Sequence, residues 1–144
     1  MLIHLLPEQV SAAWDAVAPS IAEGLPPAQQ ASHQTMVGIL QAILEDRVAV
    51  WAYLSEDEVP MTKAIITTAE YRDPVLHTPS LLIYSFTALE SLTVEQWKDG
   101  FETLRQYAVG MGVESIIAYT ANKAVIQMAT SRLGASAEYV LLEF

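Results

Sequence analysis

Hydrophobic side chains recur with helical spacing in the first third of the chain. Over residues 7–24 the apolar positions follow one another at intervals of four, three and four residues, at Val10, Trp14, Val17 and Ile21. This period predicts an amphipathic helix, and Pro19 is expected to kink or split it. A second helix is predicted over residues 32–47, where Ser32 suits the N-cap position.

From residue 48 the spacing changes to that of β-strands. Residues 48–71 are typical of two strands joined by a polar turn at residues 55–60, and residues 79–89 predict a third, more continuously apolar strand. A helical stripe returns over residues 93–112, where Gly112 suits the position just past a helix end. The chain is then expected to finish with a strand at 114–120, a helix at 122–134 and a strand at 137–144.

The predicted order is therefore helix, helix, strand, strand, strand, helix, strand, helix, strand. Strands that first meander and then alternate with helices predict a mixed sheet with helices on both faces, an α/β fold of the α+β mixed-sheet kind. No internal repeat, low-complexity tract or linker interrupts the pattern. Residues 1–144 are predicted to form a single domain.

The charge balance narrows the choice of partners. The chain carries 17 acidic and 7 basic residues, a net charge of -10, which argues against nucleic-acid binding. It contains no cysteine, which excludes disulfides and thiolate catalysis, and its three histidines are too scattered for a zinc pattern. Neither a signal peptide nor a bilayer-spanning apolar run is apparent. We expect a soluble, intracellular, cytoplasmic protein without a metal, a membrane or a nucleic-acid partner.

The element order and element lengths resemble the GNAT (N-acetyltransferase) superfamily over nearly the whole chain. The best local match is "LLIYSF", the long helix ending "YAVGMGV", and "SIIAYTANKAV…SRLGA". These segments look like the family's central strand, its cofactor helix, the next strand and the helix after it. Within the superfamily the chain resembles small, divergent GNAT-like proteins of tailed phages.

The resemblance implies a cleft for acyl-CoA between two strands that splay apart. Main-chain groups of Phe86, Thr87 and Ala88 would pair with the pantetheine of acetyl-CoA. Tyr119 would lie on the opposite strand, and Asn122 would sit on the rim of the cleft at the start of the following helix. Asn122 is equally an ordinary helix N-cap, so its pattern leaves both roles open.

The family's phosphate loop, Gln/Arg-x-x-Gly-x-Gly/Ala, is degenerate in this chain. Gln96, Asp99 and Phe101 occupy the three defining positions, so only Gln96 agrees. Glycine there would let backbone amides approach a diphosphate, which Phe101 does not allow. Thr93 to Gln96 also form a capping-box sequence, which gives Gln96 a purely local role as the alternative. Glu90, Glu95 and Asp99 add negative charge beside this helix start, with Lys98 to offset them.

The catalytic residues that the resemblance implies are also altered. The family's acid, a tyrosine four residues before the helix-ending glycine, is replaced here by Thr130. Tyr119 and Tyr84 lie on strands near the expected cleft and are candidate acids, although a strand tyrosine more often packs in a core. The candidate bases for an amine acceptor are Glu70, Asp73 and His77.

Two functions from different classes remain. One is an acyl-CoA-dependent N-acetyltransferase that moves an acetyl group to an amine. The other is a catalytically inactive GNAT-fold protein that binds a protein partner, such as a phage virion component or an adaptor. The acidic surface suits docking on a basic partner, and it also keeps an apolar protein in solution.

Overall fold

The computed structural model describes residues 1–27, 29–137 and 142. Within them the chain forms a five-stranded sheet in the order β1-β2-β3-β4-β5. Strands β1 to β4 pair with one another in antiparallel fashion. Strand β5 pairs with β4 in parallel, so the sheet is mixed. The strands are β1 Leu2–Leu5, β2 Val48–Leu54, β3 Thr62–Arg72, β4 Pro79–Ala88 and β5 Ile116–Ala118.

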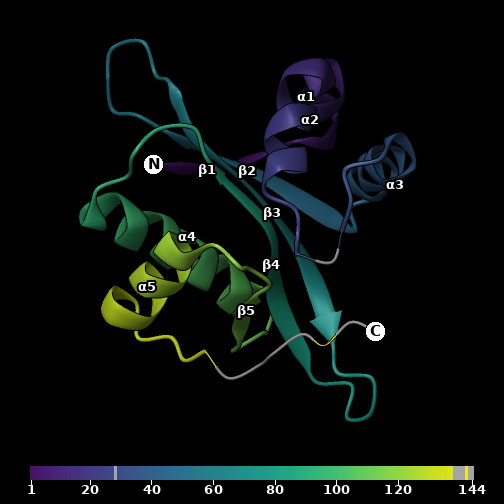
Figure 1. Cartoon of the computed structure of the whole chain (residues 1–144), viewed down its shortest axis with the longest axis vertical. Helices are drawn as coiled ribbons and strands as arrows, with labels where there is room; N and C mark the ends of the chain where they lie inside the picture. Colours follow the sequence, from purple (N-terminus) through teal and green to yellow (C-terminus); the bar gives the residue numbers. More distant parts are fainter. Residues whose placement is uncertain (28, 138–141, 143–144) are drawn as a thin grey trace.

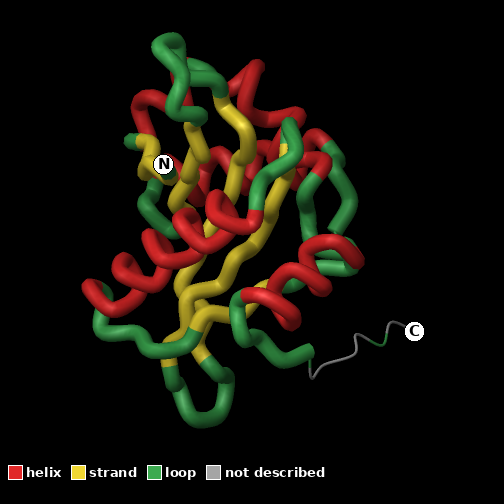
Figure 2. Tube along the Cα trace, turned by 90° about the vertical axis from the view of Figure 1, so that its left-hand side faces the viewer, coloured by secondary structure: helices red, strands yellow, loops and turns green. Residues whose placement is uncertain are grey.

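Helices cover both faces of this sheet. Figure 1 shows α1, α2 and α3 on one side of the strands and α4 with α5 on the other. In the view turned by 90° the helices lie in front of and behind the strands (Figure 2). The helices are α1 Pro7–Ala12, α2 Trp14–Glu23, α3 His33–Leu44, α4 Val94–Gly110 and α5 Lys123–Arg132.

Each face of the sheet has its own hydrophobic core, because strand side chains alternate between the two faces. Under α1–α3 the buried residues are Val10, Val17, Ile21, Ile39, Ile43, Val50, Ala52 and Ile65. Under α4 they are Leu2, Trp51, Tyr53, Ala64, Ile66, Leu81, Leu104, Ala108 and Val113. The predicted helical stripes supply the helix side of both clusters, which confirms the mixed α/β layering.

The first strand was not expected from the sequence. Residues 2–5 pair with β2, with Leu2 opposite Tyr53 and Leu5 opposite Val50. A four-residue run with a histidine in it is too short to show a period. The pairing is completed by His4, which lies opposite Trp51 and stacks on its ring with the centroids 4.6 Å apart.

The first predicted helix is split, but not at the proline. The break lies at Ala13, whose φ of -104° and ψ of 17° depart from helical values, and Pro19 lies inside α2. Although a proline inside a helix removes one hydrogen bond and crowds the carbonyl four residues before it, α2 continues through Pro19 to Glu23. The expectation of a break at Pro19 is therefore wrong.

Other local predictions are confirmed. Ser32 caps α3 by accepting from the amide of Thr35, and Gly112 follows α4 with a φ of 76°. The two hairpin strands and the third strand lie where the pattern placed them. The strand predicted at residues 137–144 falls almost entirely outside the described residues.

Candidate functional site

Strands β4 and β5 separate partway along β4. Their parallel pairing runs from Leu81 opposite Ile116 to Ile83 opposite Ala118 and stops there. Strand β4 continues to Ala88 while still paired with β3 on its other side. The outward edge of β4 beyond Ile83 is thus not paired with β5, and residues 86–88, for which the family resemblance implied a splay, lie on this part of β4.

A β-bulge lies at the point of separation. Thr67 of β3 pairs with Ser85 and Thr68 pairs with Ile83, which leaves Tyr84 as the extra residue of β4. Bulges of this kind re-aim side chains and are frequent beside functional sites. Tyr84 packs against the core under α1–α3, and burial raises the pKa of its hydroxyl above the usual value. Burial thus stabilises the neutral form of this hydroxyl, which makes it a weaker acid than an exposed tyrosine.

The released edge of β4 is met by the loop after α2. The amide of Phe86 donates to the carbonyl oxygen of Gly24 at 3.4 Å, and the hydroxyl of Thr87 donates to the carbonyl of Ser20. A side chain on Gly24 would overlap the Phe86 carbonyl and the Thr87 hydroxyl, so glycine is needed for this approach. The main-chain groups predicted to pair with pantetheine are partly engaged by the protein itself.

The ring of Phe86 connects this edge to the start of α4. It stacks on Trp97 with the ring centroids 4.8 Å apart and the planes at 28°. Trp97 lies in the first turns of α4, one residue after Gln96. The residues predicted to hold pantetheine and the residue predicted to meet the diphosphate are therefore next to each other in space.

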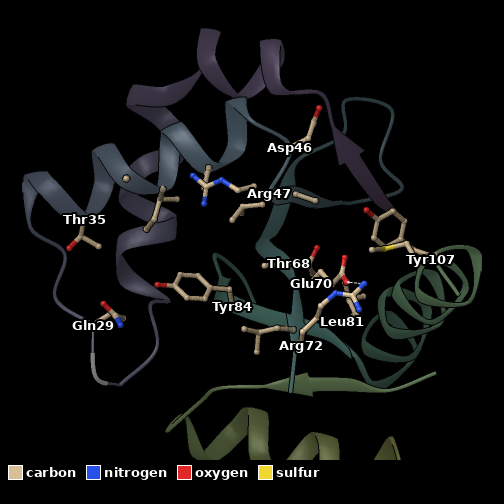
Figure 3. Close-up of a pocket in the computed structure, with 18 residues that line it drawn as sticks. Gln29, Thr35, Asp46, Arg47, Thr68, Glu70, Arg72, Leu81, Tyr84 and Tyr107 are labelled. Carbon is tan, nitrogen blue, oxygen red and sulfur yellow. Dashed lines mark ion pairs between the residues drawn. The ribbon is translucent and has the colours of Figure 1, made fainter. Parts of the chain in front are cut away.

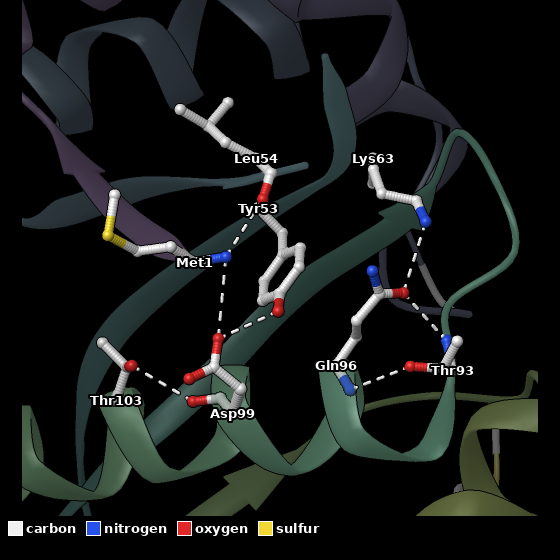
Figure 4. A network of polar contacts seen from close by, with 8 residues as sticks. All are labelled: Met1, Tyr53, Leu54, Lys63, Thr93, Gln96, Asp99 and Thr103. Atoms are coloured by element: carbon white, nitrogen blue, oxygen red, sulfur yellow. Dashed lines mark hydrogen bonds and ion pairs between the residues drawn. The ribbon is translucent and has the colours of Figure 1, made fainter. Parts of the chain in front are cut away.

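The N-terminus of α4 is capped by its own side chains (Figure 4). Thr93 accepts from the amide of Gln96 at 3.2 Å, and Oε1 of Gln96 accepts from the amide of Thr93 at 2.9 Å. The ammonium of Lys63, which belongs to β3, also donates to Oε1 of Gln96 at 3.3 Å. The capping-box alternative for Gln96 is confirmed, and the structure adds a cation that the sequence did not assign to this position.

Asp99 faces the sheet from the next turn of α4. Its carboxylate accepts from the Tyr53 hydroxyl at 2.9 Å and lies 3.6 Å from the Met1 ammonium (Figure 4). Burial first, and then this carboxylate, raise the pKa of Tyr53 to about 12. A polar groove of about 540 Å³ lies beside the α4 start, and the side chains that line it include Tyr53, Glu56, Asp57, Lys63, Glu95 and Asp99.

The rim on the β5 side is built from a polar step, "TAN". Thr120 accepts from the amide of Asn122 at 3.0 Å, and Oδ1 of Asn122 accepts from the amides of Ala124 and Val125. Asn122 therefore acts as the N-cap of α5. Tyr119 follows β5 directly, and the residue is 46% exposed. Thr130 donates to the carbonyl of Ile126 within α5.

The remaining candidates lie toward the other end of β4. Glu70 is opposite Leu81, where β4 is still paired with β5, and it forms a 2.6 Å ion pair with Arg72. Asp73 accepts from the amides of Val75 and Leu76 in the β3–β4 turn, which lowers the pKa of its carboxyl, and His77 ends that turn with a φ of 58°. None of these three positions therefore lies beside the part of β4 beyond Ile83.

Glu70 and Tyr84 line one groove of about 940 Å³ but do not face each other. Figure 3 shows Tyr84 directed toward Gln29 and Thr35, while Glu70 and Arg72 lie together on the other side. Their strand positions explain this, since Glu70 pairs with Leu81 of the α4-side core and Tyr84 belongs to the opposite core. The two predicted catalytic side chains are not brought together.

Two residues near the β4 edge were missed by sequence reasoning. Lys63 is one isolated cation in a strand, and Gly24 looks like an ordinary loop glycine after a helix. Nothing in the one-dimensional pattern indicates that they reach α4 and β4. Across the described residues no group of three or more histidine, aspartate or glutamate side chains could hold a metal ion, and no helix is long and apolar enough to cross a membrane.

Comparison with solved structures identifies the architecture. A probable acetyltransferase superposes with a TM-score of 0.68 at 10% identity, covering 100% of this chain and 95% of that one. AAC(6')-Iy in complex with the bisubstrate analog CoA-S-monomethyl-acetylneamine gives a TM-score of 0.70 at 11% identity, with 100% and 95% covered. A predicted acetyltransferase with acetyl-CoA from Clostridium acetobutylicum gives 0.68 at 14% identity, with 100% and 94% covered. The chain has the GNAT fold.

The chain shares this GNAT fold with proteins whose sequences are very different from its own. No family model matches the chain, and no curated protein matches it. At 10–14% identity the likeness to those three structures shows the architecture and leaves the chemistry to be argued from this chain's own residues.

Proposed function

We propose that this chain is a GNAT-fold acyltransferase that transfers an acyl group, such as acetyl, from acyl-CoA to an amine. The observation that carries the proposal is the end of the β4–β5 pairing at Ile83 and Ala118, while β4 runs on to Ala88. An extended pantetheine chain has amides and carbonyls that suit pairing with such an edge. Two of the similar structures hold CoA-type ligands, which supports the same use of this edge here.

In the proposed reaction the neutral amine attacks the thioester carbonyl. A carbon–nitrogen bond forms, the carbon–sulfur bond breaks, and the CoA thiolate leaves and takes up a proton. The amine gives up one proton to solvent or to a base. Tyr84, at the bulge, and Tyr119, beside the separation, are the two candidate donors of the single thiolate proton in this proposal, and the burial that raises the pKa of Tyr84 makes it the weaker acid.

The diphosphate end of the cofactor is assigned to the start of α4. The positive end of the helix dipole and the Lys63 ammonium both lie there. We propose that Gln96 also lies beside the diphosphate, where its side-chain oxygen already accepts hydrogen bonds from Lys63 and Thr93. We propose that Asn122, the N-cap of α5, lies on the rim of the cofactor site. With Glu90 and Glu95 nearby we expect the affinity to be modest, because like charges oppose an anionic ligand.

Calorimetric titration with acetyl-CoA, CoA and desulfo-CoA tests this proposal directly. Binding of all three, followed by thiol release in the presence of primary amines, is the expected result. The Tyr84→Phe and Tyr119→Phe variants then assign the proton donor, because the donor variant loses turnover and keeps its affinity for CoA. Absence of heat at millimolar acetyl-CoA, together with no thiol release, would remove the enzyme proposal.

One observation favours a second candidate, a binding protein without catalysis. The α4 start is capped by Thr93 and Gln96 and is surrounded by Glu90, Glu95 and Asp99, an arrangement that needs no ligand. Such a chain would act through its acidic surface on a protein with a basic one, as a virion component or an adaptor does. Full retention of partner binding in a chain that binds no acyl-CoA would support this candidate.

A further inference from the structure

The outward edge of β4 is the part of the proposed cleft that the chain itself occupies. After β5 leaves at Ile83, the next outward amide with a recorded partner is that of Phe86, which donates to the carbonyl of Gly24. Gly24 thus takes the place on β4 that an added strand or an extended ligand would take. We call residues 22–25 the Gly24 strap.

We infer that the Gly24 strap is a gate on the β4 edge, and that the Gly24 carbonyl must leave the Phe86 amide before an extended ligand can pair there. This inference rests on the proposed function for the identity of the ligand as acyl-CoA. The gate itself is a property of this chain and can be measured without any ligand.

The strap meets β4 through the hydrogen bond from the Phe86 amide to the Gly24 carbonyl, next to a hydroxyl contact between β4 and α2. Thr87 donates to the Ser20 carbonyl, and Thr67 and Ser85 exchange a hydrogen bond in the same buried row of hydroxyls beneath α2. The bond from Phe86 to Gly24 is long, at 3.4 Å. A long hydrogen bond is weak, and a ligand carbonyl can replace the Gly24 carbonyl one for one.

The strap is short because the core holds the chain on both sides of Gly24. Ile21 is 1% exposed in the core under α1–α3, and Leu25 packs against the same cluster. Opening therefore needs a local displacement of Gly24 and the last residues of α2, and leaves α2 in place up to Ile21. Local openings of this kind have much smaller free energies than global unfolding.

The requirement for glycine comes from space and not from backbone conformation. Gly24 has a φ of -97°, which any residue adopts, but an added Cβ would overlap the Phe86 carbonyl and the Thr87 hydroxyl. Gly24→Ala should therefore displace the strap while leaving its backbone allowed. Gly38→Ala in α3 is the matched control, because nothing lies within 4 Å of its added Cβ.

Hydrogen exchange read by NMR tests the gate without a ligand. In Gly24→Ala we expect the Phe86 amide to exchange about tenfold faster than in wild type, with the Leu81 amide unchanged. The Leu81 amide is the internal control, because it lies on the same strand and donates to the carbonyl of Ser115 at 2.8 Å. Equal acceleration at both amides would mean global destabilisation, and no acceleration at Phe86 would mean that the strap does not cover the edge. Either result overturns the inference.

Titration with acetyl-CoA then links the gate to the proposed function. Removing one competing hydrogen bond should tighten binding about fivefold in Gly24→Ala, with no change in Gly38→Ala. If Gly24→Ala folds poorly, Thr87→Val removes the neighbouring hydrogen bond from β4 to the Ser20 carbonyl of α2 and should change the Phe86 exchange in the same direction. Faster exchange without any heat would support the gate and remove the acyl-CoA proposal. Binding with equal affinity in wild type and Gly24→Ala would overturn the gate and keep the acyl-CoA proposal.

Discussion

Gln96 is the residue where the structural and the cofactor interpretations make opposite predictions. Its side chain caps α4 by accepting from the Thr93 amide at 2.9 Å and also accepts from the Lys63 ammonium at 3.3 Å. Gln96→Glu keeps an acceptor of the same shape and adds a negative charge at the positive end of the helix. The substitution should therefore stabilise the fold and weaken the binding of an anionic cofactor.

The magnitude follows from these contacts. A negative charge in the first turn of a helix contributes about 0.3–1 kcal/mol, and a part-exposed pair with Lys63 adds at most about 1 kcal/mol. For a chain of this size roughly 1 kcal/mol raises the melting temperature by about 2–4 °C. Repulsion between the new carboxylate and a diphosphate a few ångströms away should weaken binding on the order of tenfold at low salt.

Differential scanning calorimetry and titration with acetyl-CoA measure the two effects on the same sample. Gln34→Glu is the matched control, because Gln34 is exposed and also lies in the first turn of a helix, α3. It should raise the melting temperature and leave the affinity unchanged. If Gln96→Glu binds acetyl-CoA as tightly as wild type, the diphosphate does not lie at the α4 start. If it melts earlier than wild type, the capping argument is wrong.

Three further changes test the electrostatics and the core. Tyr53 has a folded-state pKa of about 12, above its unfolded value near 10, so its contribution to stability is complete below pH 10 and is lost as the pH rises to about 12. Tyr53→Phe should make denaturant-measured stability fall less steeply across that window, and an unchanged slope would contradict the assignment. Lys63→Met should weaken acetyl-CoA binding and reduce the salt dependence of that binding. If wild type and Lys63→Met bind acetyl-CoA with the same affinity at low and at high salt, Lys63 has no role in binding. Ile43→Ala should cost about 2–5 kcal/mol of unfolding free energy and Leu44→Ala less than about 1, because their side chains are 1% and 51% exposed, and equal urea midpoints would refute the core described here.

The fold was largely predictable because its elements are signalled locally. The stripes of α2, α3 and α4, the polar turn at residues 55–60 and the caps at Ser32 and Thr93 all rest on neighbouring residues. Strand β1 was missed because it is stable only through pairing with β2, a contact across more than forty residues of sequence. The break at Ala13 was missed because alanine carries no local signal for a helix end.

The candidate site was predictable only where it depends on strand order. The separation of β4 from β5 followed from a fold resemblance, and the capping role of Gln96 followed from its spacing to Thr93. The opposite facing of Glu70 and Tyr84 did not follow, because it depends on the register that pairs Glu70 with Leu81, and that register is a tertiary contact between β3 and β4. Lys63 and Gly24 reach the site through tertiary contacts that a single sequence does not display.

The contacts at the two ends of the proposed acyl-CoA site predict weak binding of that ligand. At one end the Phe86 amide is satisfied by Gly24, and at the other the Thr93 amide is satisfied by Gln96. A ligand that pairs with either group exchanges an internal hydrogen bond for an external one, so the net gain at each end is small. The resident carbonyl and the resident side-chain oxygen therefore limit affinity even where the geometry suits the ligand. This account also explains how a GNAT fold persists without the glycines of the phosphate loop, because a helix start capped by its own side chains is stable whether or not a diphosphate is bound.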